Sequence, residues 1–367
     1  MLYAILKIQR TMYRIDTITN DMLDEHFKRY AKEAQRYMTE LRDGVITIPS
    51  EFGRTHRIFI KYKVKVGSPT WQFFDKYAKE ENLRKLLCGS WHELLEIISD
   101  VENWIPNLEW QNRATKSSYE NGEYHTDGLD TDGRMLIDHF NEIARWVFVD
   151  KMYETSLDKL QFIEQLSLKI CPYCGRQHIN VAQFPGYRDS KPNIDHFLPK
   201  SSYPFLAISF RNLIPCCSVC NEMANKGNYD PLKPTIGLYN PYVFNDESVK
   251  FIGVFNGPDE QDENSYDVDI KCNPITLEHG YKEVLKLLPF YKQERLKVQD
   301  IYINFTTNTQ RYKSFLKNLG VSQDFLDDDV RMIIGHPLDG KASQREFYKF
   351  KRDLFLQLVK MYKMTDT

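Results

Sequence analysis

Apolar residues recur at spacings of three and four near the start of the chain. Between residues 20 and 43 this stripe comprises Phe27, Tyr30, Ala34, Tyr37 and Leu41. The spacing matches one face of a helix, so the segment is predicted to be an amphipathic helix with Asn20 as its N-cap. Residues 69–100 repeat the pattern in shorter stretches and predict two further helices.

Residues 57–66 instead alternate between the two faces of a predicted strand. One face would hold Ile58, Ile60, Tyr62, Val64 and Val66, and the other Arg57, Phe59, Lys61, Lys63 and Lys65. The alternation predicts a half-buried strand. Its basic face is either an ordinary solvated surface, which we favour, or a surface that follows a phosphate backbone.

The rest of the chain alternates between polar segments, helices and short strands. Residues 107–132 are polar and contain several turn-forming residues, which predicts a long loop. Helical periodicity returns over 134–169 and again from Ile275 to the end, and two strands are expected at 250–255 and 266–271.

These elements predict an α+β protein with three regions. A helix-rich N-terminal region with a small strand pair would cover residues 1–133. A central module with its supporting helices would cover 134–245, and short strands with a helical C-terminal region would cover 246–367.

Composition limits the class of protein. The 367 residues are 42% hydrophobic and 13% aromatic, which is enough for well-packed cores. The net charge of −2 argues against a broadly basic surface, so any contact with nucleic acid must be local. No apolar run approaches the roughly 18 residues of a membrane span, and the first residues lack a signal-peptide pattern. We therefore expect a cytoplasmic protein without a membrane partner.

Cysteines form the most specific pattern in the sequence. Cys171 and Cys174 make one Cys-x-x-Cys pair, and Cys217 and Cys220 make another. Two such pairs supply the four thiolates of a closed, structural zinc site. Cys216 offers a competing register with Cys220, but the spacing favours Cys217. His178 would then be a surface residue of the hairpin, since the zinc shell is already complete.

A second set of polar residues is interleaved with the cysteines. Asp195-His196 is followed by two apolar residues and a proline, then by Asn212-Leu-Ile-Pro, and then by Cys220-Asn221 with Lys226 nearby. From Cys171 to about Tyr229 this order resembles the HNH (ββα-metal) endonucleases of the zinc-knuckle type. The resemblance implies a zinc-stapled ββα-metal HNH module in the central region, flanked by the helix-rich N- and C-terminal regions.

The resemblance also implies a role for each polar residue. His196 would be the general base, Asp195 and Asn221 the ligands of a catalytic Mg or Mn ion, and Asn212 the residue that orders the loop and orients His196. Lys226 would contact a phosphate, although the family often has this lysine three residues after the asparagine and here it follows five residues later. Histidine titrates near neutral pH, and oxygen donors suit a hard cation, so the residue types match phosphodiester hydrolysis.

The C-terminal segments LLPFYKQER and KFKRDLFLQL are similar to the helical tails of bacterial anti-phage defence HNH nucleases paired with ATPases, of the Septu type. This resemblance implies a DNA endonuclease that contacts the DNA backbone and has an AAA- or SMC-like ATPase partner. Two alternatives stay open from the residues. One is an HNH nuclease that cleaves RNA, and the other is a catalytically inactive, zinc-bound interaction subunit.

Overall fold

The computed structural model describes most of the chain. The described residues are 14–52, 56–64, 66–105, 118–120, 123–125, 135–137, 140–183, 185–186, 190–233, 237–319, 327–338 and 342–365. Most of the loop expected at 107–132, and Lys65 of the expected basic face, lie outside these residues.

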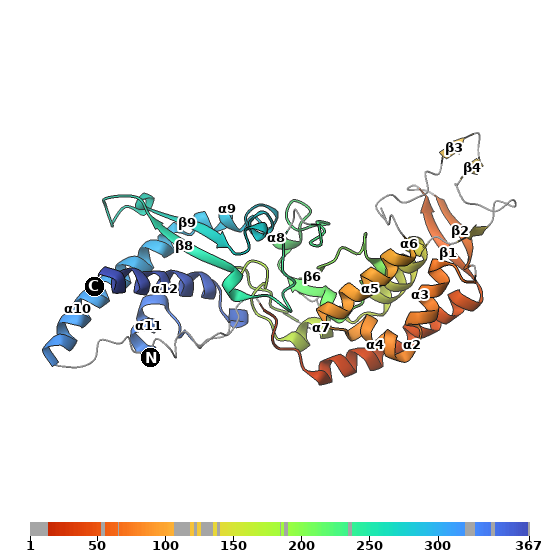
Figure 1. Cartoon of the computed structure of the whole chain (residues 1–367), viewed down its shortest axis with the longest axis horizontal. Helices are drawn as coiled ribbons and strands as arrows, with labels where there is room; N and C mark the ends of the chain where they lie inside the picture. Colours follow the sequence, from red (N-terminus) through yellow and green to blue (C-terminus); the bar gives the residue numbers. More distant parts are fainter. Residues whose placement is uncertain are drawn as a thin grey trace. The chain divides into compact units, whose positions relative to one another are not determined.

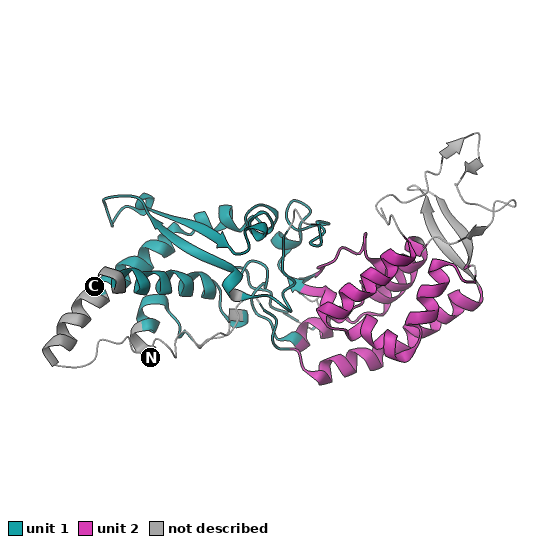
Figure 2. Cartoon of the chain, viewed as in Figure 1, with its two compact units in different colours: residues 1–17, 166–194, 215–367 teal, residues 18–165, 195–214 magenta. Residues whose placement is uncertain are grey.

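The chain divides into two compact units, each built from separate stretches of sequence (Figure 2). Unit 1 contains residues 1–17, 166–194 and 215–367, and unit 2 contains residues 18–165 and 195–214. The chain passes from unit 1 to unit 2 within strand β6 (Asn193–His196) and returns within strand β7 (Leu213–Cys216), to which β6 is paired.

Helices form the core of unit 2 (Figure 1). They are α2 (Asn20–Asp43), α3 (Pro69–Tyr77), α4 (Glu80–Cys88), α5 (Trp91–Trp104), α6 (Phe140–Ala144), the π-helix η1 (Arg145–Ser156) and α7 (Lys159–Leu166). The prediction of α2 is confirmed, but its N-cap is Thr19, whose hydroxyl accepts from the amide of Met22. Three helices occupy the segment in which two were expected, because the first expected helix is divided at Ala78 and Lys79 into α3 and α4. The second corresponds to α5, which Ser90 starts with a capping box.

The buried face of α2 differs by one position from the predicted stripe. Its buried residues are His26, Tyr30, Ala34, Met38 and Leu41. Phe27 and Tyr37 are only half-buried. The prediction favoured aromatic rings over a histidine at a core position, whereas His26 is satisfied there by a backbone carbonyl, as described below.

The strand predicted at 57–66 is confirmed as β2 (His56–Lys63). It pairs antiparallel with β1 (Val45–Phe52) and parallel with β5 (Met135–Ile137). Val66 lies beyond the strand and is 75% exposed, which corrects its assignment to the buried face. β5 also corrects the helical prediction at 134–169, because residues 135–137 are extended and complete this sheet. A separate hairpin is formed by β3 (Ser118–Glu120) and β4 (Glu123–His125).

Unit 1 contains the other hairpin and the C-terminal helices. Strands β8 (Val249–Phe255) and β9 (Tyr266–Cys272) confirm the predicted pair. The helices are α8 (Ser218–Asn221), the π-helix η7 (His279–Val284), α9 (Leu287–Lys292), α10 (Arg295–Leu319), α11 (Asp327–Ile334) and α12 (Tyr348–Thr365).

Side chains of α12 complete one edge of β8. A carboxylate oxygen of Asp353 accepts from the amide of Phe251 at 3.1 Å, and the amide group of Gln357 bonds both the N–H and the C=O of Gly253 at 2.8 Å. These bonds satisfy backbone groups that a lone hairpin edge would leave open. Within the described residues, no helix combines the length and apolar composition needed to cross a membrane.

Candidate metal centre and catalytic loop

Two Cys-x-x-Cys pairs meet in unit 1. The sulfur atoms of Cys171, Cys174, Cys217 and Cys220 all lie within 4.8 Å of one another, and all four residues are buried. The Sγ atoms of Cys174 and Cys217 are 4.0 Å apart. Zinc–sulfur bonds of about 2.3 Å in a tetrahedron place sulfur atoms about 3.8 Å apart, so the cluster can hold a structural zinc ion.

The electrostatics of the cluster agree with a cation site. Hydrogen bonds from the neighbouring thiols hold the pKa of Cys174 well below its usual value, whereas burial raises that of Cys171. Four sulfurs in so small a space can become thiolates together only around a positive charge. Cys216 is buried next to Cys217 but is not part of the cluster, which contains the cysteine that the spacing favoured. His178 is exposed and lies 3.4 Å from a carboxylate oxygen of Glu346.

The first knuckle is held by backbone contacts with the C-terminal region of unit 1. Gly175 has φ +64°, which closes the turn, and its amide donates to the carbonyl of Cys171 at 2.9 Å. The hydroxyl of Tyr291 donates to the carbonyl of Cys174, and the amide of Phe347 donates to that of Gly175, both at 2.8 Å. The knuckle is therefore part of the core of unit 1.

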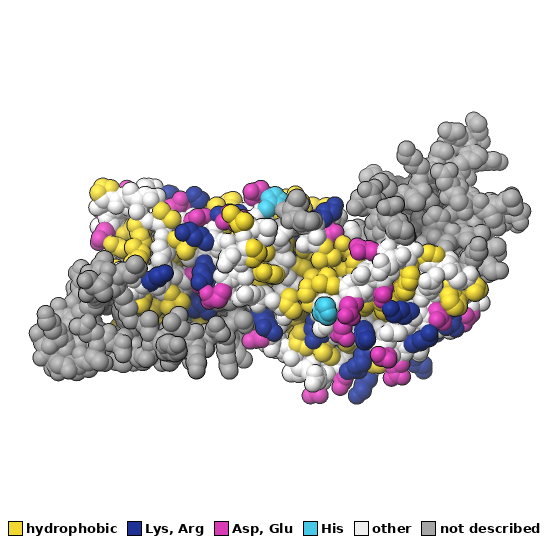
Figure 3. All heavy atoms as spheres, viewed as in Figure 1, with side chains coloured by type: hydrophobic (Ala, Val, Ile, Leu, Met, Phe, Trp, Pro, Cys, Tyr) yellow, Lys and Arg dark blue, Asp and Glu magenta, His cyan; other side chains and the backbone are white. Residues whose placement is uncertain are grey.

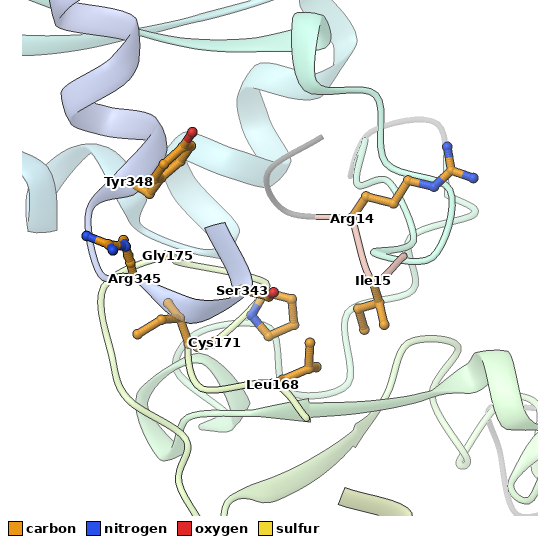
Figure 4. Close-up of a pocket in the computed structure, with 10 residues that line it drawn as sticks. Arg14, Ile15, Leu168, Cys171, Gly175, Ser343, Arg345 and Tyr348 are labelled. Atoms are coloured by element: carbon orange, nitrogen blue, oxygen red, sulfur yellow. The ribbon is translucent and has the colours of Figure 1, made fainter. Parts of the chain in front are cut away.

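A pocket lies behind this knuckle. Figure 4 shows Arg14 and Arg345 on opposite sides of it, with Cys171 and Ser343 between them. Its walls are largely apolar, and none of the predicted catalytic residues lines it. The pocket therefore does not define the catalytic centre.

His196, the predicted base, is held in a defined orientation in unit 2. It is 6% exposed, and its Nε2 atom lies 2.9 Å from the carbonyl oxygen of Ala207. A carbonyl can only accept, so Nε2 carries the proton and the neutral ring has its lone pair on Nδ1. The ring of Tyr153 packs edge-on against the imidazole, with 4.4 Å between the ring centroids.

Asn212 links the two ends of the loop that follows His196. Its Oδ1 accepts from the amide of Leu198 at 2.7 Å, and its Nδ2 donates to the carbonyls of Leu198 at 3.1 Å and Leu206 at 3.0 Å. Its carbonyl accepts from the amide of Phe197 at 2.9 Å, next to His196. Asn212 is completely buried, so each of these bonds forms away from water.

Three further residues anchor the loop to the helices of unit 2, and the sequence patterns did not identify them. Nε2 of His26 donates to the carbonyl of Ile208 at 2.9 Å. Ser209 donates to the carbonyl of Leu86 at 2.5 Å, and Arg211 donates to the carbonyls of Cys88 at 2.6 Å and Gly89 at 2.8 Å. Of the three, only His26 could have been found from the sequence, because its helical spacing from Tyr30 and Ala34 indicates a buried position.

His26 is neutral in the folded protein. The imidazole is fully buried among the rings of Tyr30, Phe162 and Phe210, and this burial lowers its pKa to about 4. The nearby charge of Arg29 lowers the pKa further, against the opposing effect of the bond to Ile208.

The remaining predicted site residues are divided between the units. Asp195 precedes His196 on β6 in unit 2 and is 5% exposed. Asn221 ends α8 in unit 1 and is half-buried, and its amide donates to the carbonyl of Cys217 at 3.2 Å. Lys226 is completely buried in the turn that follows, and its amide donates to the carbonyl of Cys220.

The fold and site thus define an α+β protein with a buried four-cysteine cluster that can hold zinc. Over 98 residues, or 27% of the chain, it is 39% identical to Septu protein PtuB of Bacillus thuringiensis, of which the match covers 33%. Over 76 residues it is 34% identical to protein ea31 of Escherichia phage lambda, of which 22% is covered. The chain therefore spans a third or less of the curated relatives it matches. No family model and no solved structure matches it. The similarity to PtuB and the cysteine cluster together support the interpretation of the chain as a Septu-like protein.

Proposed function

We propose that the chain is a metal-dependent HNH endonuclease that hydrolyses phosphodiester bonds of DNA. The observation that carries the proposal is the fixed orientation and tautomer of the His196 ring. Its Nε2–H is engaged by Ala207, and its loop is closed by the three side-chain bonds of Asn212. A general base needs a fixed ring with an acceptor nitrogen. With the proton on Nε2 that acceptor is Nδ1, which would take the proton of an attacking water.

The neighbouring residues would perform the other tasks of the reaction. Asp195 and Asn221 would hold Mg or Mn through a carboxylate and an amide oxygen, a donor set that these hard cations prefer. When bound, the cation stabilises negative charge on the scissile phosphate and on the leaving oxygen. Lys226 remains the proposed phosphate contact, and because it is fully buried, that contact requires the turn after Asn221 to open.

The order of the secondary-structure elements along the chain supports this assignment, and so does the position of the cysteine cluster. β6 ends with Asp195 and His196, β7 follows Asn212, and α8 ends with Asn221. A zinc ion on the four cysteines would fix the start of α8 and hence the backbone of Asn221, because Cys217 is the N-cap of α8 and Cys220 lies within it. In this proposal zinc stabilises the site and takes no part in the chemistry.

We further propose that the protein acts in anti-phage defence with an ATPase subunit. The partial similarity to a Septu protein supports a defence role, and a net charge of −2 supports delivery to DNA by another component. Co-expression with an AAA- or SMC-like ATPase of a Septu-type system, followed by size-exclusion chromatography, tests the partner. A chain that elutes alone in the presence of that protein contradicts this part of the proposal.

Plasmid nicking tests the activity itself. The zinc-loaded chain, with and without the ATPase, should convert supercoiled plasmid to nicked or linear product in Mg²⁺ or Mn²⁺, and EDTA should abolish the reaction. The same assay on RNA separates the two substrates. Absence of cleavage of either nucleic acid under all these conditions would support the inactive interaction subunit instead.

A further inference from the structure

Two lysines of unit 2 contact the same aromatic ring as His196, that of Tyr153. This ring contacts the imidazole edge-on, with centroids 4.4 Å apart. The Nζ atoms of Lys159 and Lys200 lie 4.2 and 4.8 Å from the centroid of the same ring. Two ammonium groups from distant parts of the sequence are therefore one aromatic side chain away from the proposed base.

The carboxylate of Glu154 joins the two lysines. Its Oε1 accepts from Lys200 at 2.8 Å, and its Oε2 accepts from Lys159 at 2.6 Å. Partial burial raises the pKa of Glu154, but the bonds from the two lysines outweigh that effect and lower it, so the group is ionised at neutral pH. Two positive charges against one negative charge leave the cluster cationic. Its two ammonium groups face a pair of oxygens, as they would on a phosphate group.

The backbone brings these residues together at the end of a helix. Tyr153 and Glu154 lie in the last turn of η1, where the amide of Leu157 donates to the carbonyl of Met152 at 2.7 Å. π-Helical turns are uncommon and occur frequently at functional sites. Lys159 begins α7, and Lys200 lies in the loop that Asn212 closes.

The charged groups are open to a ligand. The side chains of Lys159, Lys200 and Glu154 are 26%, 35% and 45% exposed. On the face shown in Figure 3, Lys and Arg side chains are interspersed with Asp and Glu and form no broad basic patch. A nucleic-acid contact on this face would therefore depend on a few local cations. Exposed ion pairs add little to folding stability, so stability alone gives weak reason for gathering two lysines here.

We propose that Lys159 and Lys200 bind a backbone phosphate of the DNA substrate next to the scissile phosphate. The proposal rests on the nuclease function and specifies where that function contacts its substrate. Glu154 holds the two ammonium groups in place and offsets one of their charges. Tyr153 is a positioning residue that joins the phosphate site to His196.

DNA binding by the full-length His196→Ala protein tests the site without interference from cleavage. A fluorescent duplex is titrated at several salt concentrations, and Lys159→Ala and Lys200→Ala are each added to this parent. Each loss of a phosphate contact should weaken binding by about five- to tenfold at 0.1 M salt, and should reduce the slope of log K against log salt by about 1.

Glu154→Gln separates a phosphate site from a structural ion pair. The substitution removes the neutralising charge and keeps the shape, so it should strengthen DNA binding severalfold while the lysine variants weaken it. Lys79→Ala is the matched control, because Lys79 is an exposed lysine of the same unit bonded to Asp75, and it should leave binding unchanged. Melting temperatures identify any variant that fails to fold.

The outcomes separate this site from the nuclease proposal. Lysine variants that bind DNA like their parent, a Glu154→Gln variant that binds no better, or a parent that binds no DNA would each overturn the phosphate site. If binding changes as expected but the protein with His196 intact cleaves nothing, the phosphate site stands and the nuclease proposal fails.

Discussion

Nε2 of His196 lies 2.9 Å from the carbonyl oxygen of Ala207, 11 residues further along the chain. This contact selects one tautomer of the imidazole and leaves Nδ1 as its acceptor. The loop between the two residues is closed by Asn212 and anchored to α2 and α4 through His26, Ser209 and Arg211. The orientation of one predicted catalytic side chain thus depends on packing throughout unit 2.

His196→Ala should abolish most of the cleavage without unfolding the protein. Removing a general base lowers the rate by roughly 10²- to 10⁴-fold, while Asp195 and Asn221 remain to bind metal. Nicking rates and calorimetric Mg²⁺ titrations on the wild-type and variant proteins measure the two effects separately. Wild-type cleavage by His196→Ala would refute the HNH assignment.

Asn221→Ala should act on metal affinity. Because the asparagine supplies one of only two proposed protein ligands, its loss should raise the Mg²⁺ concentration needed for half-maximal cleavage by about tenfold or more, and Mn²⁺ should restore part of the rate. The neighbouring Glu222→Ala is a control, since Glu222 is exposed and has no proposed role. An unchanged metal dependence in Asn221→Ala contradicts the ligand assignment.

Asn212→Ala should damage stability and turnover together. The substitution removes the side-chain partner of the buried amide and carbonyl of Leu198, at a cost of about 1–3 kcal/mol for an unsatisfied buried group. Turnover should fall because the loop no longer orients His196, whereas Mg²⁺ affinity should change little. Urea unfolding and nicking kinetics provide the measurements. Asn212→Asp should fail in the same way, since a carboxylate cannot donate to Leu206.

Cys174→Ser should release zinc and lower the melting temperature, because metal binding and folding of the knuckle are coupled. Cys216→Ser is a matched control, since Cys216 is equally buried and lies next to Cys217 but outside the cluster. Elemental analysis and thermal unfolding give the result. A Cys174→Ser protein that keeps one zinc per chain and its full melting temperature would rule out the structural site.

His26 should make the stability of unit 2 depend on pH. Its pKa is lowered from 6.5 to about 4 by burial, so between these values the unfolded chain takes up a proton that the folded chain does not. Stability is therefore complete above pH 6.5 and falls as the pH is lowered to 4, by about 3 kcal/mol in total.

His26→Gln keeps a donor for the carbonyl of Ile208 and cannot titrate, so urea unfolding of this variant should show a smaller loss between pH 6.5 and 4.5. His336 in unit 1 has a pKa lowered in the same way, also to about 4, and should retain its own contribution in the variant. An identical pH dependence in wild type and His26→Gln would contradict the prediction.

The sequence alone determined the features that depend on local spacing. Two residues between cysteines identified Cys171, Cys174, Cys217 and Cys220, and the structure gathers these four sulfurs and leaves Cys216 out. Helical and alternating periodicity likewise identified α2, β2, β8 and β9, because burial of one face imposes its period on the residues. The order of Asp195, His196, Asn212 and Asn221 predicted a catalytic set, and that set awaits the experiments above.

Only the tertiary structure decided the long-range contacts. β5 was predicted as helix because three residues carry too little periodicity to reveal pairing with β2, more than 70 positions earlier. His26 and Arg211 gave no catalytic signal, since their partners are backbone carbonyls, which every residue possesses. Tyr153, Lys159 and Lys200 converge only when η1, α7 and the loop after His196 pack together. Hydrogen bonds to the backbone and contacts between distant segments leave no fixed spacing in a sequence, and so only the folded chain reveals them.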